Sequence, residues 1–215
     1  MRLYSYFRSS AAYRVRIALN LKGLDYETLT VRLRRHRGEQ HAAEYLARNP
    51  QGLIPALDVG PAVLAQSLAI IEYLEEIKPS PPLLPDNPLE RAQVRAMALN
   101  IACDVHPLNN LRVLEYLRGP LTQPEPAVQS WYEHWIANGF RGLEVLAARH
   151  SKAGRNLFGD AVTLADVLLV PQMYNARRFR CNLVPYPTLT AIDAHLAALP
   201  AFASARPELQ PDAEP

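Results

Sequence analysis

The 215-residue sequence has only two cysteines and no long hydrophobic run. Cys103 and Cys181 lie far apart and belong to no CxxC or Cys/His cluster, which argues against a structural zinc site and against a disulfide framework. The longest apolar stretches are broken by Arg, Asp or Pro well before the roughly 20 residues that a membrane span needs. No apolar secretory signal follows Met1, so we expect a cytoplasmic protein with no membrane contact.

Lysine is also scarce, with three Lys against twenty Arg. Arginine grips carboxylates through its planar fork, although the base composition of a genome would produce the same excess. A net charge of +2 and a pI near 8.6 are too low for a typical nucleic-acid-binding protein, which has a pI above about 9 and clustered basic residues. A hydrophobic content of 49% with 20% charged residues is ordinary for a globular protein, and the length favours two domains.

The first part of the chain has the pattern of an α/β domain. Residues 2–6 alternate as a strand, a helix with Ser at its N-cap runs to Lys22-Gly23, and residues 26–31 form a second strand. This order predicts a right-handed βαβ unit with parallel strands. A short helix is expected at 39–46, a hairpin within 53–64, and a further helix from Ser67.

Five prolines within residues 79–88 mark a domain boundary, because neither a helix nor a central strand persists there. We therefore predict a domain at 1–78, a linker at 79–88 and an all-α domain at 89–215. Helical patterns occupy 89–118, 127–149, 163–178 and 188–199, and residues 207–215 have the composition of a loose tail.

Several local motifs, in this order, resemble the glutathione transferase superfamily, which joins a thioredoxin-like domain to an all-α domain. Ile54-Pro55 stands where that fold has a cis-proline, and Gln66-Ser67 matches the pair that binds the γ-glutamyl carboxylate at a helix N-terminus. Residues 163–166, Thr-Leu-Ala-Asp, form a capping-box variant. Residues 8–19, R-S-S-A-A-Y-R-V-R-I-A-L, are similar to the zeta-class signature S-S-C-x-x-R-V-R-I-A-L, and the likeness runs from Arg2 to about Pro211.

The zeta class contains maleylacetoacetate and maleylpyruvate isomerases, so the resemblance implies a cis-trans isomerase. Glutathione is its non-consumed cofactor, acting by thiolate addition, bond rotation and elimination. Ala11 stands where the signature has Cys, which leaves the thiol of glutathione as the nucleophile. We predict that Ser9 donates a hydrogen bond to the sulfur, helped by Ser10 and the backbone of Ala11; alternatively, Ser9 or Ser10 is only an N-cap.

The resemblance also implies a set of binding residues. Arg8, Arg112 and Arg178 are expected to bind substrate carboxylates; without the resemblance, each would be read as a solvated surface charge. His106 and Asn110 are expected to reach glutathione from the second domain or from a partner subunit, and Gln40 to contact its glycine end. The alternatives are a packed or exposed His near Pro107 and a surface Gln. The basic loop at 32–37 either steers anions or is a solvated run. The full cofactor-binding set is Ser9, Ser10, Ala11, Gln40, Ile54, Pro55, Gln66, Ser67, His106 and Asn110, with no metal.

Maleylacetoacetate, from tyrosine and phenylalanine breakdown, is the expected substrate because most of the class serves that reaction. Maleylpyruvate, from gentisate-type degradation, suits the three arginines equally well. A glutathione transferase or dehalogenase acting on α-halo acids would use the same thiolate and consume glutathione. A non-enzymatic glutathione-binding module would bind without turnover. A homodimer is expected by resemblance alone.

Overall fold

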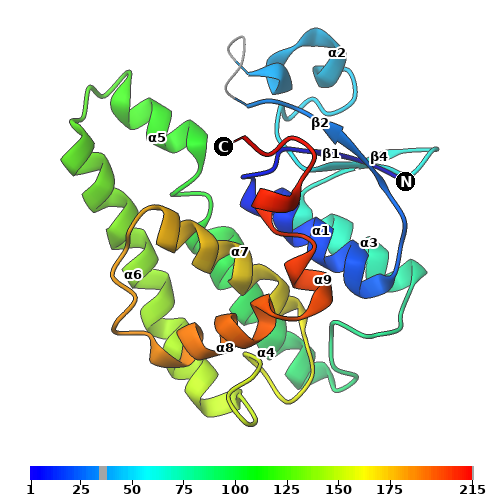
Figure 1. Ribbon diagram of the computed structural model, residues 1–215, viewed down its shortest axis with the longest axis vertical. Helices are drawn as coiled ribbons and strands as arrows, with labels where there is room; N and C mark the ends of the chain where they lie inside the picture. The colour runs from blue at the N-terminus through cyan, green and yellow to red at the C-terminus, as the bar shows by residue number, and fades with distance from the viewer. Residues whose placement is uncertain (34–37, 215) are drawn as a thin grey trace. The chain divides into compact units, whose positions relative to one another are not determined.

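The computed structural model describes residues 1–33 and 38–214, and the chain divides into two compact units (Figure 1). The first unit comprises Met1–Pro82 together with Leu199–Pro215, and the second comprises Leu83–Ala198. The division at Pro82 falls inside the predicted linker. The return of the last residues to the first unit differs from the predicted domain at 89–215. No helix in the described part of the chain is long and apolar enough to cross a membrane.

The first unit contains a four-stranded sheet in the order β2-β1-β3-β4. The strands are β1 (Arg2–Ser5), β2 (Glu27–Thr30), β3 (Ala56–Asp58) and β4 (Val63–Ala65). β1 and β2 are parallel, whereas β1 with β3 and β3 with β4 are antiparallel. The structure therefore confirms both the predicted βαβ unit and the predicted hairpin.

Two helices pack together in this unit, α1 (Ser10–Lys22) and α3 (Ser67–Ile77). They lie side by side on one face of the sheet, and α2 (Ala43–Leu46) lies beyond the other face (Figure 1). Ser9 is the N-cap of α1, and Gly23 ends the helix at φ 60°, a left-handed conformation that suits glycine. A 3-10 helix, η1 (Glu39–His41), precedes α2; most of the predicted basic loop, residues 34–37, lies outside the described residues.

The last residues of the chain fold onto α1. The short helix α9 (Pro200–Ala203) contacts α1, and the Asn20 amide donates to the Ala201 carbonyl at 3.0 Å. A further 3-10 helix, η3 (Pro207–Leu209), follows. The backbone N–H of Phe7 then donates to the Asp212 carboxylate at 3.0 Å. The expectation of a loose tail from residue 207 is therefore wrong, because the segment is part of the first unit and its Asp212 carboxylate is hydrogen-bonded to Phe7.

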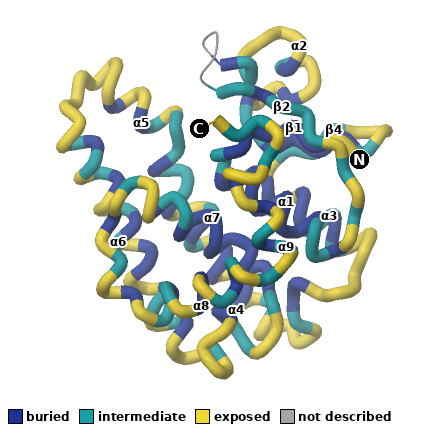
Figure 2. The backbone as a smooth tube through the Cα atoms, in the orientation of Figure 1, coloured by how far each residue is buried: buried dark blue, intermediate teal, exposed yellow. Residues whose placement is uncertain are grey.

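The second unit is helical, as predicted. Its elements are α4 (Pro88–Leu99), the π-helix η2 (Asn100–Val105), α5 (Leu111–Arg118), α6 (Glu125–His150), α7 (Leu164–Arg178) and α8 (Pro187–Ala197). The single helix predicted over 89–118 is wrong. Pro107 has no N–H to continue a helix, and the Asn110 side chain starts α5 by accepting the Arg112 N–H at 3.3 Å. Helix α7 is buried along most of its length (Figure 2).

The π-helix η2 packs against α6 at Gly139. A Cβ atom added at Gly139 would overlap the Cγ2 methyl of Val105, whose β-branched side chain has little rotamer freedom. We therefore expect Gly139→Ala to lower the free energy of unfolding by about 1–3 kcal/mol, measured by urea denaturation.

Gly142, one turn further along α6, provides the matched control. A Cβ there meets nothing within 4 Å, so Gly142→Ala should leave stability unchanged or raise it by up to about 1 kcal/mol through helix propensity. Val105→Ala removes the overlapping methyl, and its combination with Gly139→Ala should cost less than the sum of the two single changes. Equal effects of Gly139→Ala and Gly142→Ala would contradict the close approach.

Candidate functional site

Three turns of the first unit meet at one edge of the sheet. The strand register places Tyr4 opposite Ala56 and Ala56 opposite Ala65. The segment after β1, the residue before β3 and the residue after β4 therefore share that edge. These positions carry Ser9, the cis Ile54-Pro55 bond and Gln66. The fold thus brings together residues that the sequence predicts as a single site, although they are up to 57 positions apart.

Ser9 occupies the N-cap of α1, where its Oγ accepts the Ala12 N–H at 3.2 Å. Ser9 is therefore an N-cap, and its predicted role toward sulfur stays a prediction. The N-cap does not compete with a role toward sulfur, because a hydroxyl that accepts one hydrogen bond keeps its own hydrogen to donate. Ser10, the first residue of α1, is buried, and Ala11 is half-buried. The helix N-terminus adds partial positive charge that favours an anion at this point.

The cis bond predicted at Ile54-Pro55 is present. The preceding segment is held through the Leu53 carbonyl, which accepts from the Tyr45 hydroxyl at 2.6 Å and from the Asn49 amide at 2.7 Å. Burial raises the pKa of Tyr45 to about 12, so its phenol remains a donor at neutral pH. Two donors on the Leu53 carbonyl therefore fix the backbone just before Ile54-Pro55.

Gln66 and Ser67 stand at the start of α3, where the γ-glutamyl carboxylate is predicted. Gln66 has φ 69°, a left-handed conformation that is uncommon for a residue with a side chain, and its amide donates to the Gln51 side chain at 2.7 Å. Ser67 is buried, and its Oγ accepts from the Arg14 guanidinium at 3.3 Å. This donor set, with the Ser9 hydroxyl and the cis-proline, fits a peptide that carries both a carboxylate and a thiol.

Gln40 lies in η1, next to the same region. A Cβ at Gly52 would be 3.4 Å from the Gln40 carbonyl, so η1 runs close to the segment that leads to Pro55. The Gln40 Oε1 is buried and has no hydrogen-bond partner among residues 1–33 and 38–214. Its predicted contact with the glycine end of glutathione stays a prediction.

In the second unit, the predicted residues gather around α6. The amide nitrogen of Asn110 lies 3.2 Å from His106 Nε2, and Asn109 between them donates to the Tyr132 carbonyl at 3.1 Å. Tyr132 stacks on Phe179 with ring centroids 3.8 Å apart, and the guanidinium of Arg178 lies 4.8 Å from the centroid of the Phe179 ring. Asn109, the chain neighbour of Asn110, is therefore connected through Tyr132 and Phe179 to Arg178. Arg112 is exposed in the first turn of α5.

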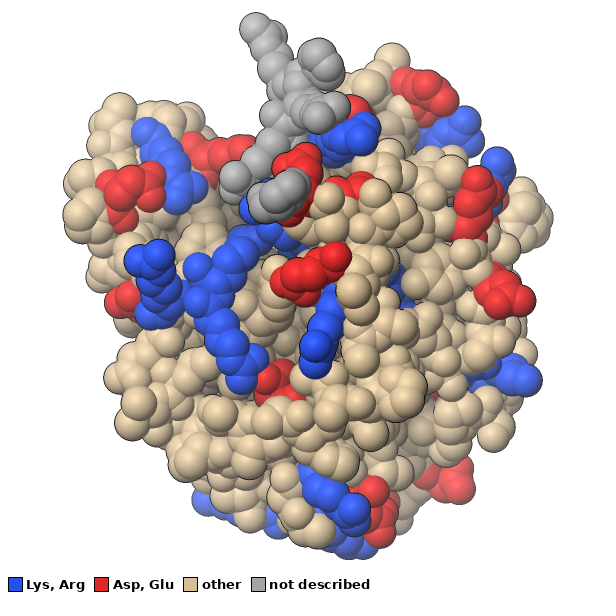
Figure 3. Space-filling model, in the orientation of Figure 1, with Lys and Arg blue, Asp and Glu red and all other residues tan. Residues whose placement is uncertain are grey.

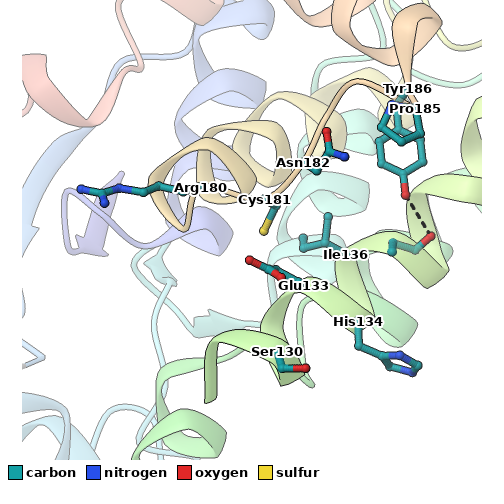
Figure 4. Close-up of a pocket in the computed structure, with 10 residues that line it drawn as sticks. Ser130, Glu133, His134, Ile136, Arg180, Cys181, Asn182, Pro185 and Tyr186 are labelled. Carbon is teal, nitrogen blue, oxygen red and sulfur yellow. Dashed lines mark hydrogen bonds between the residues drawn. The ribbon is translucent and has the colours of Figure 1, made fainter. Parts of the chain in front are cut away.

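A separate cavity of about 450 Å³ lies in the second unit between α6 and the segment that follows α7 (Figure 4). The Cys181 thiol and the Glu133 carboxylate point toward each other, whereas Arg180 points away from them. Burial raises the pKa of Cys181 to about 12, so this thiol is protonated and a poor nucleophile at neutral pH. Its lining contains none of the predicted site residues. The lining residues are Ser130, Glu133, His134, Ile136, Ala137, Arg180, Cys181, Asn182, Pro185 and Tyr186.

Neither a metal-ligand cluster in the described part of the chain nor a surface of one charge sign on the face in Figure 3 marks a functional site. The described part of the chain holds no group of three or more His, Cys, Asp or Glu side chains able to bind a metal ion. The face in Figure 3 carries both basic and acidic side chains. A surface with both signs of charge agrees with the small net charge of the sequence.

Two features of this site were not found in the sequence. The arginines of the signature differ in role: Arg16 is completely buried and donates to the carbonyls of Ala205 and Phe7, each at 3.0 Å, so it supports the fold. Arg8 instead pairs with Glu214 from the C-terminal segment. Spacing along the chain carries no signal for a contact between residues 206 positions apart.

Comparison with known proteins identifies close relatives. Residues 1–76 match the family model of the glutathione S-transferase N-terminal domain. The chain is 56% identical over 211 residues to a probable maleylacetoacetate isomerase of Vibrio cholerae, covering 98% of this chain and 97% of that protein.

Two solved structures are similar over the full length of both chains. The holo structure of a bacterial maleylpyruvate isomerase, a zeta-class glutathione transferase, is 50% identical with a TM-score of 0.96. The maleylacetoacetate isomerase of Methylobacterium extorquens AM1, with bound malonate and glutathione, is 40% identical with a TM-score of 0.94.

Proposed function

The chain belongs to the zeta class of the glutathione transferase family, and from this premise we propose that it is a glutathione-dependent cis-trans isomerase that converts maleylacetoacetate to fumarylacetoacetate. The observation that carries the proposal is the sheet edge at which Ser9, the cis Ile54-Pro55 bond and Gln66-Ser67 converge. These groups suit the thiol, the peptide backbone and the carboxylate of glutathione respectively.

When bound, glutathione supplies a thiolate that adds to the substrate double bond and leaves after rotation about the resulting single bond. Ser9 would donate its hydroxyl hydrogen to the sulfur while its oxygen stays bound to the Ala12 N–H. The N-terminus of α1 adds positive potential at the same place. Together, two such interactions of about 1 kcal/mol each would lower the thiol pKa from about 8.5 by one to two units.

The substrate would be held by arginine side chains. We propose that Arg8 in the first unit, with Arg112 and Arg178 in the second, binds its carboxylates through charge-assisted hydrogen bonds. Arg178 and Arg112 are exposed and Arg8 is half-buried, so all three guanidinium groups are accessible to a ligand. The malonate bound with glutathione in the Methylobacterium extorquens relative supports a small dicarboxylate as the substrate class.

A glutathione-dependence assay with maleylacetoacetate tests the proposal. We expect turnover only when glutathione is present, with no loss of glutathione over many cycles. Turnover without glutathione would overturn it. Net consumption of glutathione with an α-halo acid would favour the transferase or dehalogenase alternative, and binding to immobilised glutathione without any turnover would favour a binding module.

Maleylpyruvate is the second candidate substrate, favoured by the 50% identity and the TM-score of 0.96 to the bacterial maleylpyruvate isomerase. Both molecules present carboxylates to the same arginines. The ratio of kcat/KM for the two substrates, measured side by side, distinguishes them.

We also propose a cytoplasmic homodimer that acts in tyrosine and phenylalanine breakdown. Dependence on a reduced thiol cofactor suits a reducing compartment, and both cysteines of the chain are free thiols. Family membership supports the dimer and the pathway. Light scattering on the purified protein tests the dimer.

A further inference from the structure

The C-terminal segment reaches the turn that carries the proposed catalytic serine. Beyond η3, the chain is tied back to itself by Gln210, whose amide donates to the Arg206 carbonyl at 2.8 Å and to the Ser204 carbonyl at 3.2 Å. Asp212 then accepts the Phe7 N–H at 3.0 Å. The segment therefore approaches the turn between β1 and α1 from a fixed direction.

The Phe7 peptide groups are held from two sides. Asp212 binds the N–H of Phe7, and the buried Arg16 donates to its carbonyl at 3.0 Å. The ring of Phe7 in turn lies under the Arg8 guanidinium, 4.5 Å from its carbon. Arg8 is thus presented by an anchored residue, in a limited range of positions.

Glu214 meets Arg8 two residues beyond that anchor. The Arg8 Nη2 lies 3.4 Å from Glu214 Oε2, with side-chain exposures of 33% and 45%. An ion pair with this much solvent access is weak and readily exchanged. The ligand on Arg8 in this structure is therefore a carboxylate that belongs to the chain itself.

We propose that Glu214 is a built-in competitor, whose carboxylate occupies the Arg8 guanidinium until a carboxylate of the substrate replaces it. The inference rests on the proposed role of Arg8 in substrate binding. Exchange of one carboxylate for another keeps Arg8 paired and pre-oriented by Phe7. A ligand without a carboxylate forms no ion pair with Arg8 when it displaces Glu214, so it gains no binding free energy there. The Arg8–Glu214 pair therefore favours small organic acids over uncharged ligands.

Calorimetric titration of malonate into the full-length protein saturated with glutathione tests this inference. Removing the competitor with Glu214→Gln should tighten malonate binding about twofold to fivefold, the size expected for an exposed ion pair. Glu208→Gln, an exposed carboxylate in η3, is the control and should change the affinity by less than the measurement error. The KM for the dicarboxylate substrate should fall by the same factor as the Kd for malonate.

A second pair of variants makes the test specific to Arg8. Arg8→Gln should weaken malonate binding, and Glu214→Gln should have no further effect in that background. If Glu214→Gln changes nothing in the wild-type background, or gives the same gain without Arg8, the competitor role is overturned. If Arg8→Gln binds malonate as the wild type does, the proposed role of Arg8 fails, and the competitor role fails with it. If Arg8→Gln loses malonate binding but Glu214→Gln leaves the malonate affinity unchanged, the competitor role of Glu214 is overturned while the role of Arg8 in substrate binding stands.

Discussion

Replacement of Asp166 by alanine is expected to lower the free energy of unfolding by about 3–5 kcal/mol. The Asp166 carboxylate is completely buried at the start of α7 and accepts from the Leu157 N–H at 2.7 Å, the Thr163 N–H at 2.8 Å and the Thr163 hydroxyl at 2.9 Å. Alanine leaves three buried donors without their acceptor, and each such loss costs about 1–3 kcal/mol before relaxation. Urea denaturation of the purified variant measures the change.

Asp160→Ala is the matched control, because this carboxylate lies six residues earlier and is exposed. It should change stability by no more than about 0.5 kcal/mol. Similar losses in the two variants would show that the capping box contributes little.

The same carboxyl group should make stability depend on pH. Burial raises the pKa of Asp166 to about 6, against about 3.9 in an unfolded chain. The folded protein therefore binds the extra proton between these values, so the contribution is fully present below about pH 4 and lost as the pH rises through about 6. Asp166→Asn abolishes this titration. The stability of the wild type relative to Asp166→Asn should fall across that window, and a constant difference would contradict the shift.

Replacement of Ser9 by alanine is expected to lower kcat/KM more than about tenfold, a loss of some 1.4 kcal/mol of transition-state stabilisation. The hydroxyl would no longer donate to the sulfur, so the thiol pKa of bound glutathione should rise. The variant also loses the N-cap of α1, which costs about 1 kcal/mol of stability. The pH dependence of kcat/KM, with thiolate absorbance in the ultraviolet, measures the pKa directly.

Two further substitutions separate the cap from the hydrogen bond to sulfur. Ser9→Asp keeps a strong N-cap acceptor, but its carboxylate cannot donate and repels a thiolate, so stability should hold while activity falls at least as far as in Ser9→Ala. Ser9→Thr keeps both functions and should keep most of the activity. Full activity in Ser9→Ala together with a large loss in Ser10→Ala would transfer the role to Ser10.

Much of the fold follows from local chemistry. Ser9 and Gly23 mark both ends of α1, and the five prolines mark the boundary between the units, because caps and prolines act on the backbone within a few residues of themselves. The single helix predicted over 89–118 is wrong because apolar residues continue on both sides of Pro107, in the π-helix η2 and in α5, so the apolar pattern alone does not show the interruption.

In the candidate site too, some residues could be predicted from the sequence and others could not. Ser9, Pro55 and Gln66 are predictable through the resemblance of their local motifs to the glutathione transferase family, and the strand register places their turns at one edge of the sheet. The arginines are not distinguishable, because burial decides whether a guanidinium supports the fold, as Arg16 does, or is accessible to a ligand, as Arg8 is. The burial of an arginine side chain depends on residues far away in the chain, and the local sequence pattern does not show which residues those are.

The division of the chain also imposes an order on biosynthesis. The second unit is an insertion between two parts of the first. Arg16 donates to the carbonyl of Ala205, 189 residues downstream, and the Phe7 N–H donates to the carboxylate of Asp212, 205 residues downstream. On the ribosome, the helical insertion is therefore free to fold first, and the sheet unit gains these two contacts only after Ala205 and Asp212 have been synthesised. A fragment cut at the proline linker would contain all four strands of the sheet but would lack the Ala205 carbonyl and the Asp212 carboxylate.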